Sequence, residues 1–130
     1  MVRRLRQAGV TIGVGMDIGH EWYTYLPIPY ITQLKQYVQA GFTVSEALVA
    51  ATKTSAELLD MGTRLGTVAP GRLADILVVR GRPDVNLDDL ANVELVVRDG
   101  WVVVEGGRVS IPRHETVTPP PPVSFSAVRE

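Results

Sequence analysis

Val10-Thr-Ile-Gly-Val-Gly-Met-Asp17 is the stretch of the sequence that decides the fold. Side chains of a strand alternate between two faces, so the bulky apolar residues of this stretch share one face and the small residues share the other with Asp17. A bulky face packs under covering helices, whereas a small face that ends in a carboxylate can line a site. The stretch predicts a strand of a parallel α/β sheet or barrel, where functional groups lie at the carboxyl ends of the strands. A second interpretation is that Asp17 only caps the turn or helix that follows.

Short segments flank the predicted strand on both sides. Before it, residues 2–7 are typical of the last turn of a helix. After it, residues 18–29 form a polar and aromatic loop that contains His20 and Glu21. Such a loop can shape a substrate pocket at the end of a barrel strand or can be a plain surface loop, and the residues leave both interpretations open.

Two helical regions follow the loop. Apolar residues at helical spacing predict a helix over residues 30–40, which a glycine ends. Thr43 and Glu46 form a capping-box pattern that opens a second helix. This helix extends to about residue 60 and is either continuous or broken near residues 52–54. The apolar stripes, predicted to be core, are Ile31, Leu34, Tyr37 and Val38 in the first helix and Val44, Ala47, Leu48, Ala51, Ser55, Leu58 and Leu59 in the second.

The pattern changes at residue 61 to short β segments separated by turns. Asp99-Gly100 is a strong signal for a two-residue hairpin, and Ala69-Pro-Gly-Arg72 predicts a type II turn. The predicted strands are residues 65–68, 74–79, 93–98, 101–105 and 108–111, with one helical turn at 87–90. The last residues are rich in proline and predict an extended or disordered tail. The sequence therefore divides into residues 1–60, 61–111 and 112–130.

The composition excludes several classes of function. The chain has 13 basic and 14 acidic side chains and no basic stripe, so we predict no nucleic-acid partner. No apolar run approaches the roughly 20 residues of a membrane helix, so we predict no membrane partner. The absence of cysteine excludes disulfides and thiolate metal sites and fits a reducing cytoplasm, which is the predicted location. Glycines interrupt the apolar residues that follow the first arginines, so we do not interpret this start as a signal peptide.

Few residues are candidates for chemistry. Asp17, His20 and Glu21 offer oxygen and nitrogen ligands of the kinds that zinc binds, but their spacing matches no compact ligand motif. No Gly-x-Ser-x-Gly motif marks a serine nucleophile. Gly13 and Gly15 lack the third glycine and the following helix of a dinucleotide-binding loop. The residues alone predict an α/β unit with a site-like strand end and no particular reaction.

Three motifs occur in a characteristic order. The first is Ala8-Gly-Val-Thr-Ile-Gly-Val-Gly-Met-Asp17, and the second is Gln39-Ala-Gly-Phe-Thr-Val-Ser-Glu-Ala-Leu48. The third is Leu65-Gly-Thr-Val-Ala-Pro-Gly-Arg-Leu-Ala-Asp-Ile-Leu-Val-Val79, followed by Val97-Arg-Asp-Gly-Trp-Val-Val103. Together they closely resemble the carboxyl-terminal third of the metal-dependent amidohydrolase superfamily, and within it the imidazolonepropionase and Xaa-Pro dipeptidase-like branch.

The resemblance implies a fold and a role for Asp17. The implied fold class is α/β: the last β/α unit of a TIM-like (β/α)8 barrel, followed by part of a small β-sandwich and incomplete as a stand-alone fold. In this family the last-strand aspartate contacts the catalytic metal and accepts a proton from the metal-bound water, which then attacks a C–N bond. The implied cofactor is a divalent metal, zinc by preference.

The resemblance also bears on the neighbours of Asp17. Met16 stands where the family usually has threonine, and by alternation it points away from the face of Asp17, so the change affects packing. His20 and Glu21 have no certain counterpart in the family, and we predict that they contact substrate. Asp75 lies in the third motif and is predicted to be structural.

The other metal ligands of such an enzyme lie in segments upstream of the last strand. They are a His-x-His pair, a bridging lysine and two further histidines, and neither His20 nor His114 occupies such a position. We therefore expect this chain to be part of a larger enzyme, with the missing amino-terminal segment as its partner. Alone, it is expected to bind no metal stably and to be inactive. The expected substrate is a small molecule or a dipeptide, with a cyclic amide, an acylated amino acid or an Xaa-Pro bond.

Two other hypotheses stay open. In one, the chain is a non-catalytic remnant that forms a homo-oligomer or binds a partner protein through its apolar barrel-facing surface. A soluble, metal-free, well-folded oligomer of this chain would favour it. In the other, the chain belongs to a split enzyme, and co-expression with a separate amino-terminal chain would restore hydrolysis.

Overall fold

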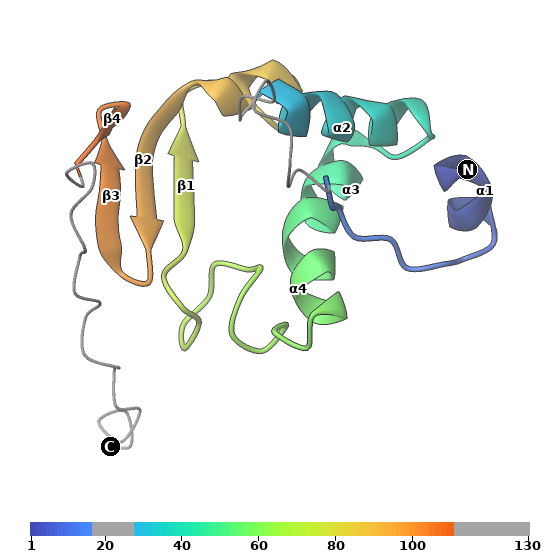
Figure 1. Cartoon of the computed structure of the whole chain (residues 1–130), viewed down its shortest axis with the longest axis horizontal. Coiled ribbons are helices and arrows are strands. Elements are labelled where there is room, and N and C mark those ends of the chain that lie inside the picture. Colours follow the sequence, from blue (N-terminus) through green and yellow to red (C-terminus); the bar gives the residue numbers. More distant parts are fainter. Residues whose placement is uncertain (17–27, 111–130) are drawn as a thin grey trace.

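The computed structural model describes residues 1–16 and 28–110 of the chain. The helices lie on one side of the structure and an antiparallel sheet lies on the other (Figure 1). The helical elements are α1 (Val2–Gln7), α2 (Ile28–Gln39), α3 (Val44–Val49), the π-helical turn η1 (Ala50–Thr54) and α4 (Ser55–Leu58). Both predicted helical regions are confirmed. The second region is one continuous helical run from α3 to α4. The π-helical turn η1 lies within it, at the place where one of the two alternatives predicted a break.

The predicted capping box opens α3. The Thr43 hydroxyl accepts a hydrogen bond from the Glu46 N–H at 3.1 Å, and the Glu46 carboxylate accepts one from the Thr43 N–H at 2.7 Å. Each residue therefore satisfies a backbone donor that the helix leaves without an intrahelical partner. Arg6 of α1 also pairs with Glu46 at 2.9 Å, which joins the two helices.

The pH dependence of stability should reflect this box. Hydrogen bonds from Thr43, and then the Arg6 guanidinium, hold the pKa of Glu46 below its usual value of 4.5. A carboxyl whose pKa is lower in the folded state stabilises that state above the unfolded pKa, and this contribution is lost as pH falls through the folded pKa. The midpoint of urea unfolding should therefore decrease as the pH is lowered below about 4.5.

Glu46→Gln is the matched control for this pH dependence. Glutamine can close the same capping box but does not titrate, so the decrease in the midpoint between pH 6 and pH 3 should be smaller in this variant. An equal decrease in both proteins would assign the acid sensitivity to other groups.

The core lies between the helices and also includes one residue from a segment that follows them in the sequence. Its members are Ile31, Leu34, Tyr37, Ala47, Ala50 and Leu87. Leu87 belongs to the 3-10 helix η2 (Leu87–Ala91), which lies where one helical turn was predicted. Lys35 of α2 pairs with Asp88 at 2.6 Å beside it. The helix η2 therefore packs the segment that joins two strands of the sheet against the helical layer.

The sheet has four antiparallel strands in the order β1-β2-β3-β4. They are β1 (Ile76–Val79), β2 (Val93–Arg98), β3 (Trp101–Glu105) and β4 (Arg108–Val109). The predicted hairpin joins β2 and β3, and Asp99 and Gly100 have φ angles of 48° and 81°. Positive φ at both positions is the type I′ geometry that suits the twist of a hairpin. The predicted type II turn is also present, with Gly71 at φ 81° and a hydrogen bond from the Arg72 N–H to the Ala69 carbonyl.

Two predicted strands are wrong in this structure. Residues 10–16 form no strand because no other strand pairs with them in the described part of the chain. Residues 65–67 form bends instead, and Gly66 among them has a φ of 84°. A Cβ on Gly66 would lie 2.9 Å from the Thr52 carbonyl oxygen and from the Lys53 Cα, so the glycine lets this loop approach η1. The barrel unit and the sandwich remain predictions, whereas the mixed helix and antiparallel sheet is what the structure shows.

Candidate active-site segment

Residues 10–16 lead from α1 back across α3 (Figure 1). Ile12 and Val14 pack against the helical core, as the alternation predicts for the bulky face. Val10 is 49% exposed and lies at the margin. The segment therefore meets the helices with its apolar residues although it forms no strand.

Two side chains of α2 hold the backbone of this segment. The Tyr37 hydroxyl donates a hydrogen bond to the Gly13 carbonyl at 2.6 Å, and the Gln33 side-chain amide donates to the Gly15 carbonyl at 2.7 Å. Burial raises the pKa of Tyr37 above its usual value of 10.0, so the hydroxyl keeps its proton and remains a donor at neutral pH. These bonds satisfy carbonyl groups that a strand partner would satisfy in a sheet.

Ser55 holds the same segment from the other helical run. Its Oγ accepts a hydrogen bond from the Val14 N–H at 3.0 Å and donates one to the Ala50 carbonyl at 2.7 Å. A hydroxyl has one proton, so the bond to Ala50 leaves the oxygen lone pairs for Val14. Ala50 begins the π-helical turn η1, and this irregular turn therefore orients the hydroxyl. We call Gln33, Tyr37 and Ser55 the backbone clamp.

Gly13 is what allows this close approach. A Cβ at this position would lie 2.9 Å from both the Ser55 Oγ and the Leu58 Cδ1. Either the helix or the segment would have to move to accept it. The small residue that the alternation assigned to the inner face therefore also serves contact with the helices.

The three predicted site residues are Asp17, His20 and Glu21, and all three lie outside the described residues. Asp75 lies within them and is structural, as predicted. Its carboxylate accepts a hydrogen bond from the Asp99 N–H at 2.6 Å, so it supports the turn between β2 and β3.

The described residues do not by themselves fit a metal. No group of three histidine, cysteine, aspartate or glutamate side chains gathers anywhere in residues 1–16 and 28–110. A catalytic zinc needs about three protein ligands and an open position. Ligands for a metal would therefore have to come from outside these two ranges.

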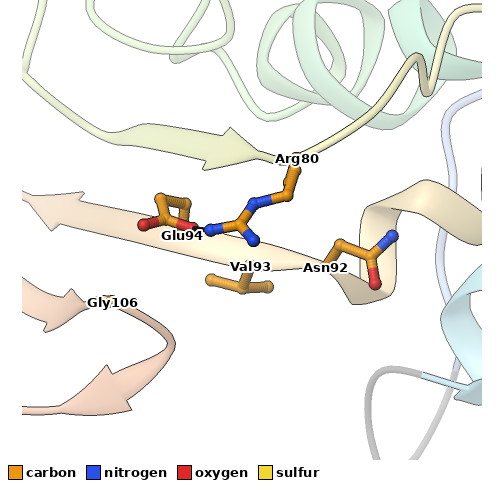
Figure 2. Close-up of a pocket in the computed structure, with 5 residues that line it drawn as sticks. All are labelled: Arg80, Asn92, Val93, Glu94 and Gly106. Carbon is orange, nitrogen blue, oxygen red and sulfur yellow. Dashed lines mark hydrogen bonds and ion pairs between the residues drawn. The ribbon is translucent and has the colours of Figure 1, made fainter.

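Two hollows in the structure offer no better site. Figure 2 shows one of about 270 Å³, where the Arg80 side chain lies over β2 and pairs with Glu94 at 2.7 Å. The two side chains of this pair neutralise each other's charge. A groove of about 580 Å³ runs between the second helical run and β1, and its lining is mainly apolar, with Leu59, Leu65 and Leu73 among its residues.

No helix of the described ranges combines the length and apolar character needed to cross a bilayer.

The sequence prediction did not identify the backbone clamp. Tyr37 and Ser55 were assigned to apolar stripes, and Gln33 was not singled out. The available signal was the presence of hydroxyl groups on helix faces that otherwise carry aliphatic side chains. Such groups need a hydrogen-bond partner when buried, and here that partner is the backbone of residues 13–15.

Comparison with known proteins relates most of the chain to one protein family. A sequence profile of the Amidohydrolase family matches residues 1–104. Imidazolonepropionase from Symbiobacterium thermophilum is 28% identical over 110 residues, which are 82% of this chain and 26% of that enzyme. A Xaa-Pro dipeptidase structure with bound methionine in the active site has a TM-score of 0.70 and 30% identity, over 81% of this chain and 25% of that one. A Bifidobacterium longum protein assigned as a prolidase has a TM-score of 0.72 and 34% identity, over 85% of this chain and 27% of that one.

The chain spans about a quarter of the length of each of these proteins. The likeness includes residues on both sides of the boundary that the sequence predicted at residue 60. It therefore covers the helical layer together with the sheet.

Proposed function

Because the chain belongs to the amidohydrolase family, we propose that it supplies the carboxyl-terminal part of a metal-dependent hydrolase that cleaves a C–N bond in the cytoplasm. The family match over residues 1–104 is the observation that carries this proposal. The likeness to an imidazolonepropionase and to a Xaa-Pro dipeptidase supports it.

Asp17 is the residue to which we assign chemistry. It would contribute one oxygen ligand to a divalent metal, zinc by preference, and accept the proton that water loses when it attacks the substrate. The chemistry that a bound metal would supply there is polarisation of the substrate carbonyl and a lower pKa of water. Our assignment of His20 and Glu21 is contact with the substrate. The remaining ligands would come from other segments of the enzyme, so we propose that this chain alone is inactive.

The substrate class follows from the relatives as a proposal. A cyclic amide would match the imidazolonepropionase, and a dipeptide with proline in the second position would match the Xaa-Pro dipeptidase. Both reactions add water across a C–N bond. The same carboxylate could therefore serve either substrate, and the choice between them would depend on the pocket.

The test compares the complete gene product that contains this sequence with the 130-residue chain alone. Each is supplied with zinc, assayed for bound metal and given imidazolonepropionate and Xaa-Pro dipeptides. We expect metal binding and hydrolysis in the complete gene product and neither in the chain alone. If the metal-loaded gene product hydrolysed none of these substrates, the proposal would be rejected.

A second candidate function is a module for homo-oligomerisation or partner binding. It is favoured by apolar residues of the sheet that remain exposed, among them Leu77, Trp101 and Val102, which are 52%, 48% and 45% exposed. Size-exclusion chromatography of the chain alone distinguishes the two functions. A well-folded, metal-free oligomer together with an inactive complete gene product would favour this candidate.

A further inference from the structure

The backbone clamp acts on the residues that immediately precede Asp17. Its hydrogen bonds go to backbone groups of three consecutive residues, 13–15. Met16 is the one residue between this clamped stretch and the carboxylate to which we assign the chemistry. The clamp therefore holds the chain at a point only one residue before Asp17 in the sequence.

The spacing of the clamp fits its target. Gln33 and Tyr37 are four residues apart on α2, which is about 6 Å along a helix. The carbonyls that they contact are two residues apart, which is about 6.6 Å in an extended chain. Both bonds can form at once because the two lengths agree and α2 runs in the opposite direction. In an extended chain the Val14 N–H points to the edge opposite the Gly13 and Gly15 carbonyls. Ser55 therefore binds the segment at its second edge.

Packing alone does not require these polar groups. The ring of Tyr37 lies 5.2 Å from that of Phe42 between centroids, and a phenylalanine could make the same contact. The Ser55 hydroxyl lies beside the π-helical turn, a feature that occurs often at functional sites. The hydroxyl and amide groups of the clamp are explained by the backbone that they hold.

We propose that Gln33, Tyr37 and Ser55 are positioning residues for the hydrolysis, because they hold the backbone of residues 13–15, which lie just before Asp17 in the sequence. This inference rests on the proposed function. Their hydrogen bonds to this segment go to its backbone, so we expect their effect to be on the alignment of the carboxylate. Misplacement of a catalytic group by about 1 Å can cost about 10²-fold in rate.

The test uses Tyr37→Phe and Ser55→Ala in the complete gene product, with Thr52→Val as the matched control. Thr52 donates its hydroxyl hydrogen bond to the Leu48 carbonyl within the helical run and not to the segment. Two quantities are measured for each protein. They are hydrogen exchange of the peptide that covers residues 10–16 and the kcat and KM per folded molecule.

In both clamp variants, exchange of residues 10–16 should be roughly 3- to 10-fold faster, as expected for the loss of one hydrogen bond. Their kcat should fall by about 10-fold or more with KM unchanged, because alignment and not substrate binding is lost. Thr52→Val should change neither quantity. Unchanged exchange, or faster exchange with an unchanged kcat, would overturn the inference. Failure of the proposed function is distinct, since the unmodified gene product would then hydrolyse nothing while the clamp variants still exchanged faster.

Discussion

Replacing Asp17 with Asn is expected to lower kcat/KM of the complete gene product by about 10²- to 10⁴-fold, the usual contribution of a general base. Asparagine has nearly the same size and keeps one oxygen that can face a metal, but its amide cannot accept the proton from water. The steady-state hydrolysis rate and the metal content should be measured together. Retained metal with a large loss of rate would locate the defect in proton transfer.

Asp75→Asn is the matched control for this substitution. Asp75 accepts one hydrogen bond, from the Asp99 N–H, and the asparagine oxygen can accept the same bond. This variant should keep close to full activity although it loses the same charge. If Asp17→Asn were as active as Asp75→Asn, Asp17 would have no catalytic role and the interpretation of Asp17 as a turn or helix cap would stand.

Replacing Leu34 with Ala should lower the free energy of unfolding by about 2–5 kcal/mol. Leu34 is the one large side chain in the described ranges with no exposed surface, at 0%. Truncation removes buried methyl groups and leaves a cavity among residues of α2, α3, η1 and η2. Because the core joins these elements, the loss should appear in a single cooperative urea transition followed by circular dichroism.

Leu59→Ala provides the comparison within the same layer. Leu59 is 74% exposed, so its truncation should change the free energy of unfolding by less than about 0.5–1 kcal/mol. Equal effects of the two substitutions would mean that Leu34 does not occupy a packed core in solution.

Local signals in the sequence predicted most elements because each depended on neighbouring residues. Thr43 and Glu46 are three residues apart and made the predicted capping box. Asp99 and Gly100 made the predicted hairpin, since positive φ is easiest for glycine and for aspartate-like residues. Here a few adjacent side chains decided the backbone geometry.

The predictions that failed depend on contacts between residues that are distant in the sequence. The pattern of residues 10–16 is that of a strand, but a strand also needs a neighbour that pairs with it, and alternation cannot report whether one is present. Ser55 and Val14 are 41 residues apart, so no local pattern could join them. Leu87 was predicted only as part of a helical turn, and its place in the helical core depends on how η2 packs against α2.

The π-helical turn η1 also bears on how related sequences should be compared. It accommodates an extra residue in one turn, so Ser55 faces about 100° away from where ordinary α-helical winding of the same residues would put it. Deleting one residue within this turn would restore ordinary winding and leave Ser55 facing as it does now, because the turn already absorbs the extra residue. A relative that is one residue shorter here can therefore keep a hydroxyl facing Val14 on an ordinary helix, whereas a relative of equal length without the π-helical turn would have its aligned serine turned away. The length and the winding of this turn together are a better marker of shared geometry than the identity of the serine.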